Sequence, residues 1–363
     1  MRVVYSREEL GDYLHSTYGP AGLLGADLTQ APLLIDRFLE SATEVDVDAV
    51  YDGVELLVGG VMEHVEEAGV HSGDSACVVP PPTLSPSAHQ EILAATERLA
   101  QALEVRGLIN IQFAVKGEEV LILEANPRAS RTVPFISKAG GVPIAKVAAR
   151  VMMGATLEDL RHEGMLADPP GENLTGHFVA VKEAVLPWER FPEEDTVLGP
   201  EMKATGEVMG IGSDFGSAYG KALLGSGCRV PDGGVVFFSL ADRDKPVGLA
   251  AAQAFSMLGF RLAATAGTAR YLAHHGVASD IVAKVGEGPG DSVSRIESGQ
   301  IALVVNTPRG RRARSDGSLI RAASRRRGIP CITTVPGALA VARSLQADDG
   351  AVHRVRSLQE WHR

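Results

Sequence analysis

Three oxygen-bearing side chains, Gln112, Glu124 and Asn126, lie on two apolar segments, GLINIQFAV and EVLILEAN, which a Lys-Gly-Glu tripeptide separates. This pattern predicts two antiparallel strands joined by a tight turn. Glu124 and Asn126 are two residues apart, so in a strand their side chains point to the same face. One carboxylate and two carboxamides form a set of hard oxygen ligands that suits Mg²⁺. The alternative is that all three are ordinary solvent-facing strand residues.

Two arginines directly after these candidate ligands favour the metal site. Arg128 and Arg131 belong to the sequence NPRASR, which begins at Asn126. Their fixed positive charge would lie where the oxygens of a transferring phosphoryl group accumulate negative charge. Guanidinium groups bind such oxygens in a bidentate manner. The combination predicts a phosphoryl-transfer site.

The elements that must position these residues begin with a predicted strand at residues 44–50, where acidic and apolar residues alternate. An Asp-Gly pair after it predicts a hairpin with the next strand. Ser85 and the proline after it begin a predicted helix that runs to about Val105. Another helix is predicted from Ile144 to Met153, and we expect mixed connecting structure over residues 155–228.

From Val235 onward, short apolar strands alternate with helices, which predicts a parallel sheet covered on both faces. The sequence Thr265-Ala266-Gly267-Thr268 follows a strand and begins a helix, so its hydroxyl and N–H groups suit a phosphate. Lys245 and Lys284 could add positive charge. Asn306 ends another strand at the same carboxyl edge, where ligands bind in open parallel sheets. The fold class is therefore α/β, with antiparallel sheets first and a parallel sheet after them.

Composition and charge exclude several classes of protein. The chain has 363 residues, enough for two or three domains, and its 45% hydrophobic and 22% charged residues are typical of a soluble globular protein. The sequence has no apolar run long enough to cross a membrane, and its start lacks the apolar stretch of a signal peptide. We therefore expect a cytoplasmic protein. Three separated cysteines indicate neither disulfides nor a zinc site. The net charge of −10 argues against nucleic-acid binding.

One basic stretch stands apart from this acidic composition. Eight arginines lie between residues 309 and 327. They could form an anion-binding edge, but charge runs are usually a solvated helix face, and that is the interpretation we favour.

Three blocks of sequence resemble the large subunit of carbamoyl phosphate synthetase. They are VMEHVEEAGVHSGDSACVVPPPTLS, the stretch from GLINIQFAV through ANPRASRTVPFISKAGGVPIAKVAARVMMG, and VKEAVLPWERFP followed by LGPEMKATGEVMGI. The first two are similar to the second ATP-grasp half of that subunit, which phosphorylates carbamate. Residues 1–228 would then be a partial ATP-grasp domain. Residues 229–363 resemble the methylglyoxal-synthase-like regulatory domain that closes the subunit.

The resemblance implies an ATP-grasp ligase that forms carbamoyl phosphate from carbamate and ATP for arginine and pyrimidine biosynthesis, with Mg²⁺ or Mn²⁺. Carried over position by position, the metal ligands are Gln112, Glu124 and Asn126, and the catalytic residues are Asn126, Arg128 and Arg131. The ATP-binding residues would be Leu39, Glu44, Gly69, Val70, His71, Ser72, Gln112 and Glu124. An effector such as UMP or IMP would bind Lys245, Thr265, Thr268, Lys284 and Asn306.

Two positions depart from the family pattern. Bacterial members often have threonine where this chain has Pro308, which would weaken one effector contact. Members activated by ornithine have tyrosine where this chain has Cys331. A response to ornithine is left open, because the rest of that site matches, at Glu66, Asp74, Glu183 and Thr333.

The resemblance also implies partners. The family's large subunit has an upstream subdomain with a glycine-rich phosphate loop and an entire first half, and a glutamine amidotransferase small subunit supplies ammonia. None of these is in the sequence given. We expect the chain alone to bind ATP poorly and to form no carbamoyl phosphate, because each lost charge-assisted contact removes about 1.5–3 kcal/mol.

Two other functions remain open. The chain could be a non-catalytic nucleotide-binding or regulatory fragment, and adding the missing upstream part in trans would distinguish this from a split enzyme. A free-standing methylglyoxal synthase explains only the last third of the chain and leaves the ANPRASRTVPF block without a purpose.

Overall fold

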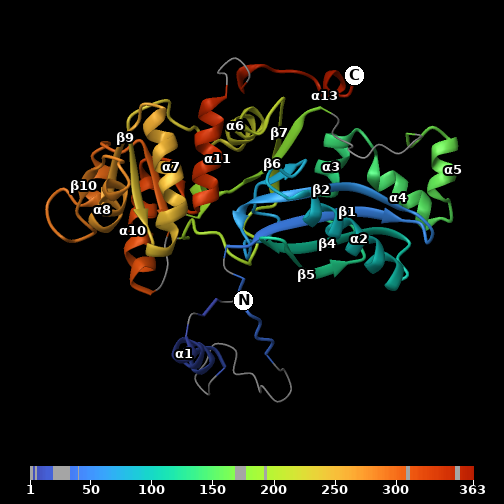
Figure 1. The fold of residues 1–363 in the computed structure, drawn as a ribbon, viewed down its shortest axis with the longest axis horizontal. Helices are drawn as coiled ribbons and strands as arrows, with labels where there is room; N and C mark the ends of the chain where they lie inside the picture. Colours follow the sequence, from blue (N-terminus) through green and yellow to red (C-terminus); the bar gives the residue numbers. More distant parts are fainter. Residues whose placement is uncertain are drawn as a thin grey trace. The chain divides into compact units, whose positions relative to one another are not determined.

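A computed structural model describes residues 3–4, 6–18, 33–39, 41–167, 177–191, 194–307, 311–347 and 352–363. The chain divides into two compact units, Met1–Glu40 and Ser41–Arg363. The first unit contains helix α1 (Arg7–Tyr18), which begins where the Ser6 hydroxyl accepts a hydrogen bond from the Glu9 amide. The second unit contains two sheets and their covering helices (Figure 1).

The first sheet has seven antiparallel strands in the order β5-β4-β1-β2-β3-β6-β7. Both predicted hairpins are confirmed, and Gly53 and Gly117 take the positive φ angles, 96° and 63°, that their turns require. The strands are β1 (Thr43–Tyr51), β2 (Leu56–Glu67), β3 (Cys77–Val79), β4 (Gly107–Lys116), β5 (Glu119–Asn126), β6 (Val179–Val185) and β7 (Gly206–Gly212).

Strand β1 is buried on both faces, and its successive side chains point alternately to one face and the other. Val45, Val47 and Ala49 pack against α2 (Pro86–Ala102), which the Ser85 side chain caps as predicted. Glu44, Asp46 and Asp48 therefore point to the opposite face. Further along that face lies a separate core with α3 (Val133–Gly140), α4 (Ile144–Met152) and α5 (Leu157–His162).

The prediction of connecting structure over residues 155–228 is wrong for α5, β6, β7, the short 3₁₀ helix η1 (Trp188–Arg190) and α6 (Phe215–Ser226). Strand β7 contains three glycines, a residue type that strands usually avoid. Close packing against α6 is the reason for two of them. A Cβ atom at Gly210 would lie 2.0 Å from the Ala218 carbonyl oxygen, and one at Gly212 would lie 2.1 Å from the Ser217 hydroxyl.

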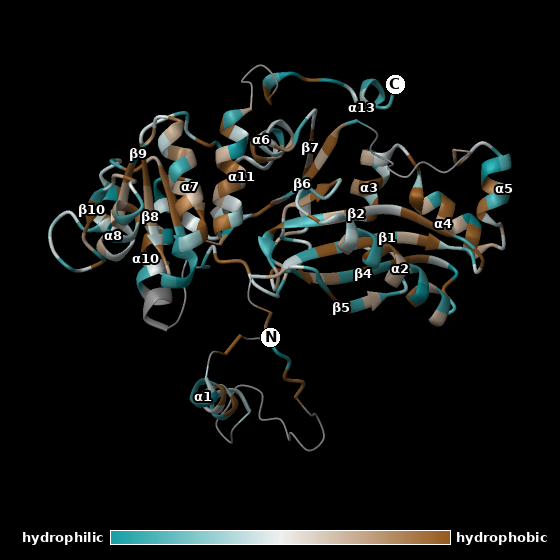
Figure 2. Cartoon of the chain, in the orientation of Figure 1, coloured by the Kyte–Doolittle hydropathy of each residue, from teal (hydrophilic) through white to brown (hydrophobic). Residues whose placement is uncertain are grey.

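The second sheet confirms the predicted parallel arrangement, with strand order β10-β9-β8-β11-β12. Its strands are β8 (Val235–Leu240), β9 (Arg261–Thr265), β10 (Asp280–Val282), β11 (Leu303–Thr307) and β12 (Cys331–Ile332). One face packs on α7 (Lys245–Met257), α8 (Ala266–His274) and α11 (Val335–Gln346). The other packs on α10 (Arg311–Arg326) and α9 (Ser292–Glu297), a helix that was not predicted. Figure 2 shows that these strands are largely hydrophobic, as strands covered on both faces must be.

The two sheets share one hydrophobic core. It runs from Val65, Val78 and Val181 of the first sheet through α6 and α11 to Val236 and Phe238 of the second. The proposed domain boundary at residues 228 and 229 stays a prediction. Among the described residues, none of the helices combines the length and apolar character that a membrane span needs.

Candidate functional site

A polar cavity of about 210 Å³ lies on the face of the first sheet that carries Asp46. It is lined by Asp46, His71, Ser72, Gly73, Asn110, Gln112, Glu124, Asn126, Arg128, Ser130, Arg131, Thr132, Lys182 and Glu207. The structure therefore brings together seven of the predicted site residues, namely His71, Ser72, Gln112, Glu124, Asn126, Arg128 and Arg131.

Strand register explains why the three candidate metal ligands converge. Gln112 on β4 lies opposite Glu124 on β5, and Asn126 lies opposite Asn110, with an irregularity in the register directly after Gln112. The Gln112 amide nitrogen donates to the Ser72 hydroxyl at 3.2 Å, and the Asn126 amide nitrogen donates to a Glu124 carboxylate oxygen at 2.7 Å. Both amides thus use their N–H groups within the protein, which leaves their carbonyl oxygens for a cation. This set of hard oxygens fits a divalent metal ion.

Three cationic side chains also line the cavity. Arg128 and Arg131 are exposed on the loop after β5. Lys182 on β6 is only 1% exposed, and its ammonium group donates to the carbonyl oxygens of Ser72 at 2.8 Å and Gly73 at 3.4 Å. Lys182 therefore both fixes the backbone of the loop after β2 and adds a cation to the cavity. We did not predict it, because it lies in the stretch that was expected to be connecting structure.

Asp48 holds two residues of the cavity lining, Asn110 and Thr132, in place. It accepts hydrogen bonds from the Asn110 amide at 2.9 Å and the Thr132 hydroxyl at 2.5 Å. Burial raises the pKa of Asp48 to about 6, although these hydrogen bonds oppose the rise. Asp46, Asp48 and Asn110 were also missed, but the period-two alternation of β1 could have placed both aspartates on the face of Glu44.

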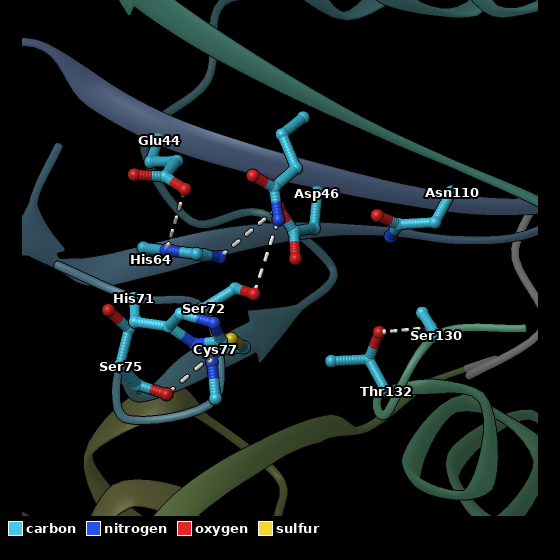
Figure 3. A network of polar contacts seen from close by, with 12 residues as sticks. Glu44, Asp46, His64, His71, Ser72, Ser75, Cys77, Asn110, Ser130 and Thr132 are labelled. Carbon is cyan, nitrogen blue, oxygen red and sulfur yellow. Dashed lines mark hydrogen bonds and ion pairs between the residues drawn. The ribbon is translucent and has the colours of Figure 1, made fainter. Parts of the chain in front are cut away.

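A buried histidine lies between two carboxylates next to the cavity (Figure 3). His64 Nδ1 is 3.9 Å from Glu44 Oε1, and His64 Nε2 is 3.6 Å from Asp46 Oδ1. Burial alone would lower the pKa of His64, but Cys77 and Asp46 raise it well above its ordinary value. One ligand atom from each of Glu44, Asp46 and His64 lies within 4.8 Å of the others, but a histidine that keeps its proton pairs with the two carboxylates and does not bind a metal ion.

The remaining predicted ATP-binding residues lie outside the cavity lining. Glu44 accepts a hydrogen bond from the Gly69 amide at 3.3 Å, so these two residues are adjacent, as the resemblance implies. Neither they nor Val70 line the cavity. Leu39 belongs to the other compact unit, and its place in the site stays a prediction.

The predicted effector residues gather at the carboxyl edge of the parallel sheet. Thr268 accepts hydrogen bonds from the Leu240 amide and the Thr265 hydroxyl, both at 3.2 Å, which ties the ends of β8 and β9 together. Lys245 lies near the start of α8, because a Cβ atom at Gly267 would lie 3.4 Å from its ammonium nitrogen. A hydrogen bond from Lys245 and its charge, with a smaller effect of the charge of Lys284, lower the pKa of Asp242.

Asn306 occupies the same edge but is buried, at 3% exposure, and its amide oxygen accepts a hydrogen bond from Arg321 at 2.7 Å. Arg321 belongs to the arginine-rich stretch and is only 1% exposed. The interpretation of that stretch as a solvated helix face is therefore wrong for this residue. Pro308, where a weaker effector contact was expected, lies outside the described residues.

The half-buried carboxyl group of Glu183, whose Oε2 atom is shielded from solvent, should make stability depend on pH. Burial, with repulsion from Glu66, raises the pKa of Glu183 to about 8, although Lys182 opposes the rise. The folded state then holds a proton that the unfolded state has already lost, so the free energy of unfolding should fall as pH rises from about 4.5 to about 8. We expect Glu183→Gln to remove this dependence, which is on the order of 5 kcal/mol across the window. Urea unfolding at several pH values measures it. Exposed Glu158→Gln is the control, and an unchanged slope in Glu183→Gln would contradict the assignment.

Two family models match the chain. The model described as carbamoyl-phosphate synthase L chain, ATP binding domain, matches residues 1–160, and the model of the MGS-like domain matches residues 248–333. A carbamoyl phosphate synthase large chain from Rubrobacter xylanophilus is 48% identical over 363 residues, which are 100% of this chain and 33% of that protein. The chain thus spans about a third of the length of such relatives.

A shorter relative is covered more completely. The protein named carbamoyl phosphate synthase large chain, C-terminal section, from Aquifex aeolicus is 47% identical over 99% of this chain and 68% of its own length. Among solved structures, the biotin carboxylase domain of a single-chain bacterial carboxylase covers 62% of this chain and 57% of its own, at 19% identity and a TM-score of 0.41, which is too low for a detailed comparison.

Proposed function

The chain belongs to the carbamoyl phosphate synthase large-chain family of ATP-grasp ligases and corresponds to its C-terminal part, and on that premise we propose that it transfers the γ-phosphoryl group of ATP to carbamate. In this reaction a carbamate oxygen forms the new bond to the γ-phosphorus while the bond to the β,γ-bridging oxygen breaks, which gives carbamoyl phosphate and ADP. The family uses ATP and a divalent metal ion. For this chain we propose Mg²⁺ or Mn²⁺.

Each predicted ATP-site residue has a proposed task, whether or not it lines the cavity. The oxygens of Gln112, Glu124 and Asn126 would hold the metal ion, which when bound neutralises charge on the nucleotide phosphates. Arg128 and Arg131 would donate hydrogen bonds to the oxygens of the transferring phosphoryl group. The nucleoside would be held by Leu39, Glu44, Gly69, Val70, His71 and Ser72.

The observation that carries this proposal is the convergence of a carboxylate, two carboxamides and two guanidinium groups on one cavity. The reverse reaction tests it directly. When the chain is combined with the remaining large-chain region, ADP and carbamoyl phosphate should yield ATP, and omission of the divalent metal should abolish the yield. If nucleotide binds but no ATP forms, the non-catalytic regulatory function replaces the catalytic one.

Within the assembled enzyme, the remaining large-chain region and a glutamine amidotransferase small subunit are the proposed partners. Together they would supply carbamate at the cavity. The family also carries an allosteric MGS-like domain, and we propose that its ligand here is a nucleoside monophosphate such as UMP or IMP.

Lys245, whose ammonium group lies near the start of α8, provides a test of this effector site. We expect Lys245→Met to weaken UMP or IMP binding at least about tenfold, because a charge-assisted hydrogen bond to phosphate contributes about 1.5–3 kcal/mol. Isothermal titration calorimetry on the purified chain measures the change. Arg270→Met, which removes an exposed cation from α8, is the matched control. Equal affinity in wild type and Lys245→Met would place the ligand elsewhere.

A further inference from the structure

Arg321 on α10 is the largest fully buried side chain among the described residues, and its partners come from two distant parts of the chain. Its Nη1 donates to the amide oxygen of Asn306 at 2.7 Å. Its Nε and Nη2 donate to the two carboxylate oxygens of Asp195, both at 2.5 Å. Burial alone would raise the pKa of Asp195, but the hydrogen bonds and charge of Arg321 lower it. The guanidinium therefore joins an effector-site residue to the segment between β6 and β7 by a bidentate ion pair.

The segment that Arg321 holds, residues 194–204, is called the bridging loop here. A second hydrogen bond attaches this loop to α10, because Arg325 donates to the Glu194 carbonyl oxygen at 2.5 Å. Helix α10 thus contacts the start of the bridging loop through two successive turns.

The other end of the bridging loop is fastened to the loop that carries His71 and Ser72. The His71 amide donates to the Gly199 carbonyl oxygen at 2.8 Å. Asp74, which is 1% exposed, accepts hydrogen bonds from the amides of Lys203 at 2.7 Å and Ala204 at 2.9 Å. Ser72 in turn accepts a hydrogen bond from Gln112, a proposed metal ligand.

Hydrogen bonds and short stretches of backbone therefore link Asn306 to Gln112. The path runs through Arg321 and the bridging loop to His71, and from His71 along the backbone to Ser72, which Gln112 contacts. We infer that Arg321 is a positioning residue that couples occupancy of the nucleoside monophosphate site to the geometry of the metal and nucleotide cavity. This inference rests on the proposed effector site. Since Arg321 holds the amide oxygen of Asn306, an anionic ligand can reach only the N–H groups of that side chain. If ligand binding moves Asn306, Arg321 must move with it. A buried guanidinium group that loses a hydrogen-bond partner cannot replace that partner with water.

The contact between Arg321 and Asp195 can be weakened with little change in shape. We propose Asp195→Asn and Arg321→Lys as test variants, with Glu297→Gln as the matched control. Glu297 on α9 pairs with Arg326 of α10 at 2.6 Å, so the control removes an ion pair of the same helix that does not involve the bridging loop.

The measurement is hydrogen–deuterium exchange of the purified chain with and without saturating UMP or IMP, read in peptides that cover residues 69–75 and 194–204. In wild type and Glu297→Gln, nucleotide should change exchange in both segments. In Asp195→Asn, nucleotide should still bind with an affinity within about threefold of wild type, but the response at residues 69–75 should be lost. If Asp195→Asn fails to fold, Arg321→Lys decides the question.

The possible failures are distinguishable. If wild type binds nucleotide without any response at residues 69–75, or if both variants keep that response, the coupling role of Arg321 is overturned while the effector site stands. If neither UMP nor IMP binds wild type in calorimetry, the effector assignment itself fails and the inference fails with it.

Discussion

Replacing Glu124 with glutamine should lower the rate of ATP-dependent carbamoyl phosphate formation at least about 10³-fold, which is about 4 kcal/mol of transition-state stabilisation. Glu124 is the single carboxylate in the proposed ligand set, and the two amides beside it carry no charge. Glutamine keeps the size of the side chain and one carbonyl oxygen but removes the negative charge that attracts a divalent cation. The rate is measured in the enzyme assembled with the remaining large-chain region.

A second measurement separates metal binding from catalysis. Titration with Mn²⁺ in the presence of ATP should show weaker binding in Glu124→Gln than in wild type. Glu119→Gln is the matched control, because Glu119 is an exposed glutamate at the other end of the same strand. Unchanged Mn²⁺ affinity and rate in Glu124→Gln would show that the metal ion has other ligands.

Replacing Asp52 with alanine should lower the free energy of unfolding by about 3 kcal/mol. Asp52 is 4% exposed and accepts hydrogen bonds from the backbone amides of Val54 at 2.8 Å, Glu55 at 2.7 Å and Leu157 at 2.8 Å. It thereby closes the β1–β2 turn and attaches the start of α5 to it. Each buried amide that loses its acceptor costs about 1–3 kcal/mol. Urea unfolding followed by circular dichroism measures the loss.

The effect of Asp52→Ala should also depend on pH. Burial alone would raise the pKa of Asp52, but hydrogen bonds from the amides of Glu55, Leu157 and Val54 lower it. A lowered carboxyl pKa stabilises the folded state above the ordinary value of 3.8, and this stabilisation is lost as pH falls through the folded-state pKa. The variant should therefore approach wild type in acid. Asp159→Ala, which removes the exposed carboxylate at the third position of the capping box that begins with Thr156, should cost clearly less than Asp52→Ala, and an equal cost at both positions would contradict the argument.

Local patterns in the sequence were sufficient for much of the candidate site. The hairpin of β4 and β5 has a clear turn and two strongly apolar strands, so the facing of Gln112 and Glu124 followed from strand geometry alone. The alternating strands and helices after Val235 likewise predicted the parallel sheet. In such a sheet every strand ends at the same edge, which is why Lys245, Thr265 and Asn306 could be expected together.

Other residues could be placed only by contacts between segments that are distant in sequence. Strand β7 is rich in glycine because α6 packs closely on it, and this reason is invisible until both elements are in place. Strand β6, which pairs with β7, was not predicted either, so Lys182 on β6 went unnoticed although it lines the cavity.

The sequence by itself determined the family, the two kinds of sheet and the chemical groups of the proposed phosphoryl-transfer site, because these depend on residue types and short periodicities. Only the tertiary structure decided that His64 lies between Glu44 and Asp46, and that Arg321 is buried against Asp195. A charged side chain on a helix is usually solvated, and whether it is instead buried depends on a partner that the chain supplies 126 residues away.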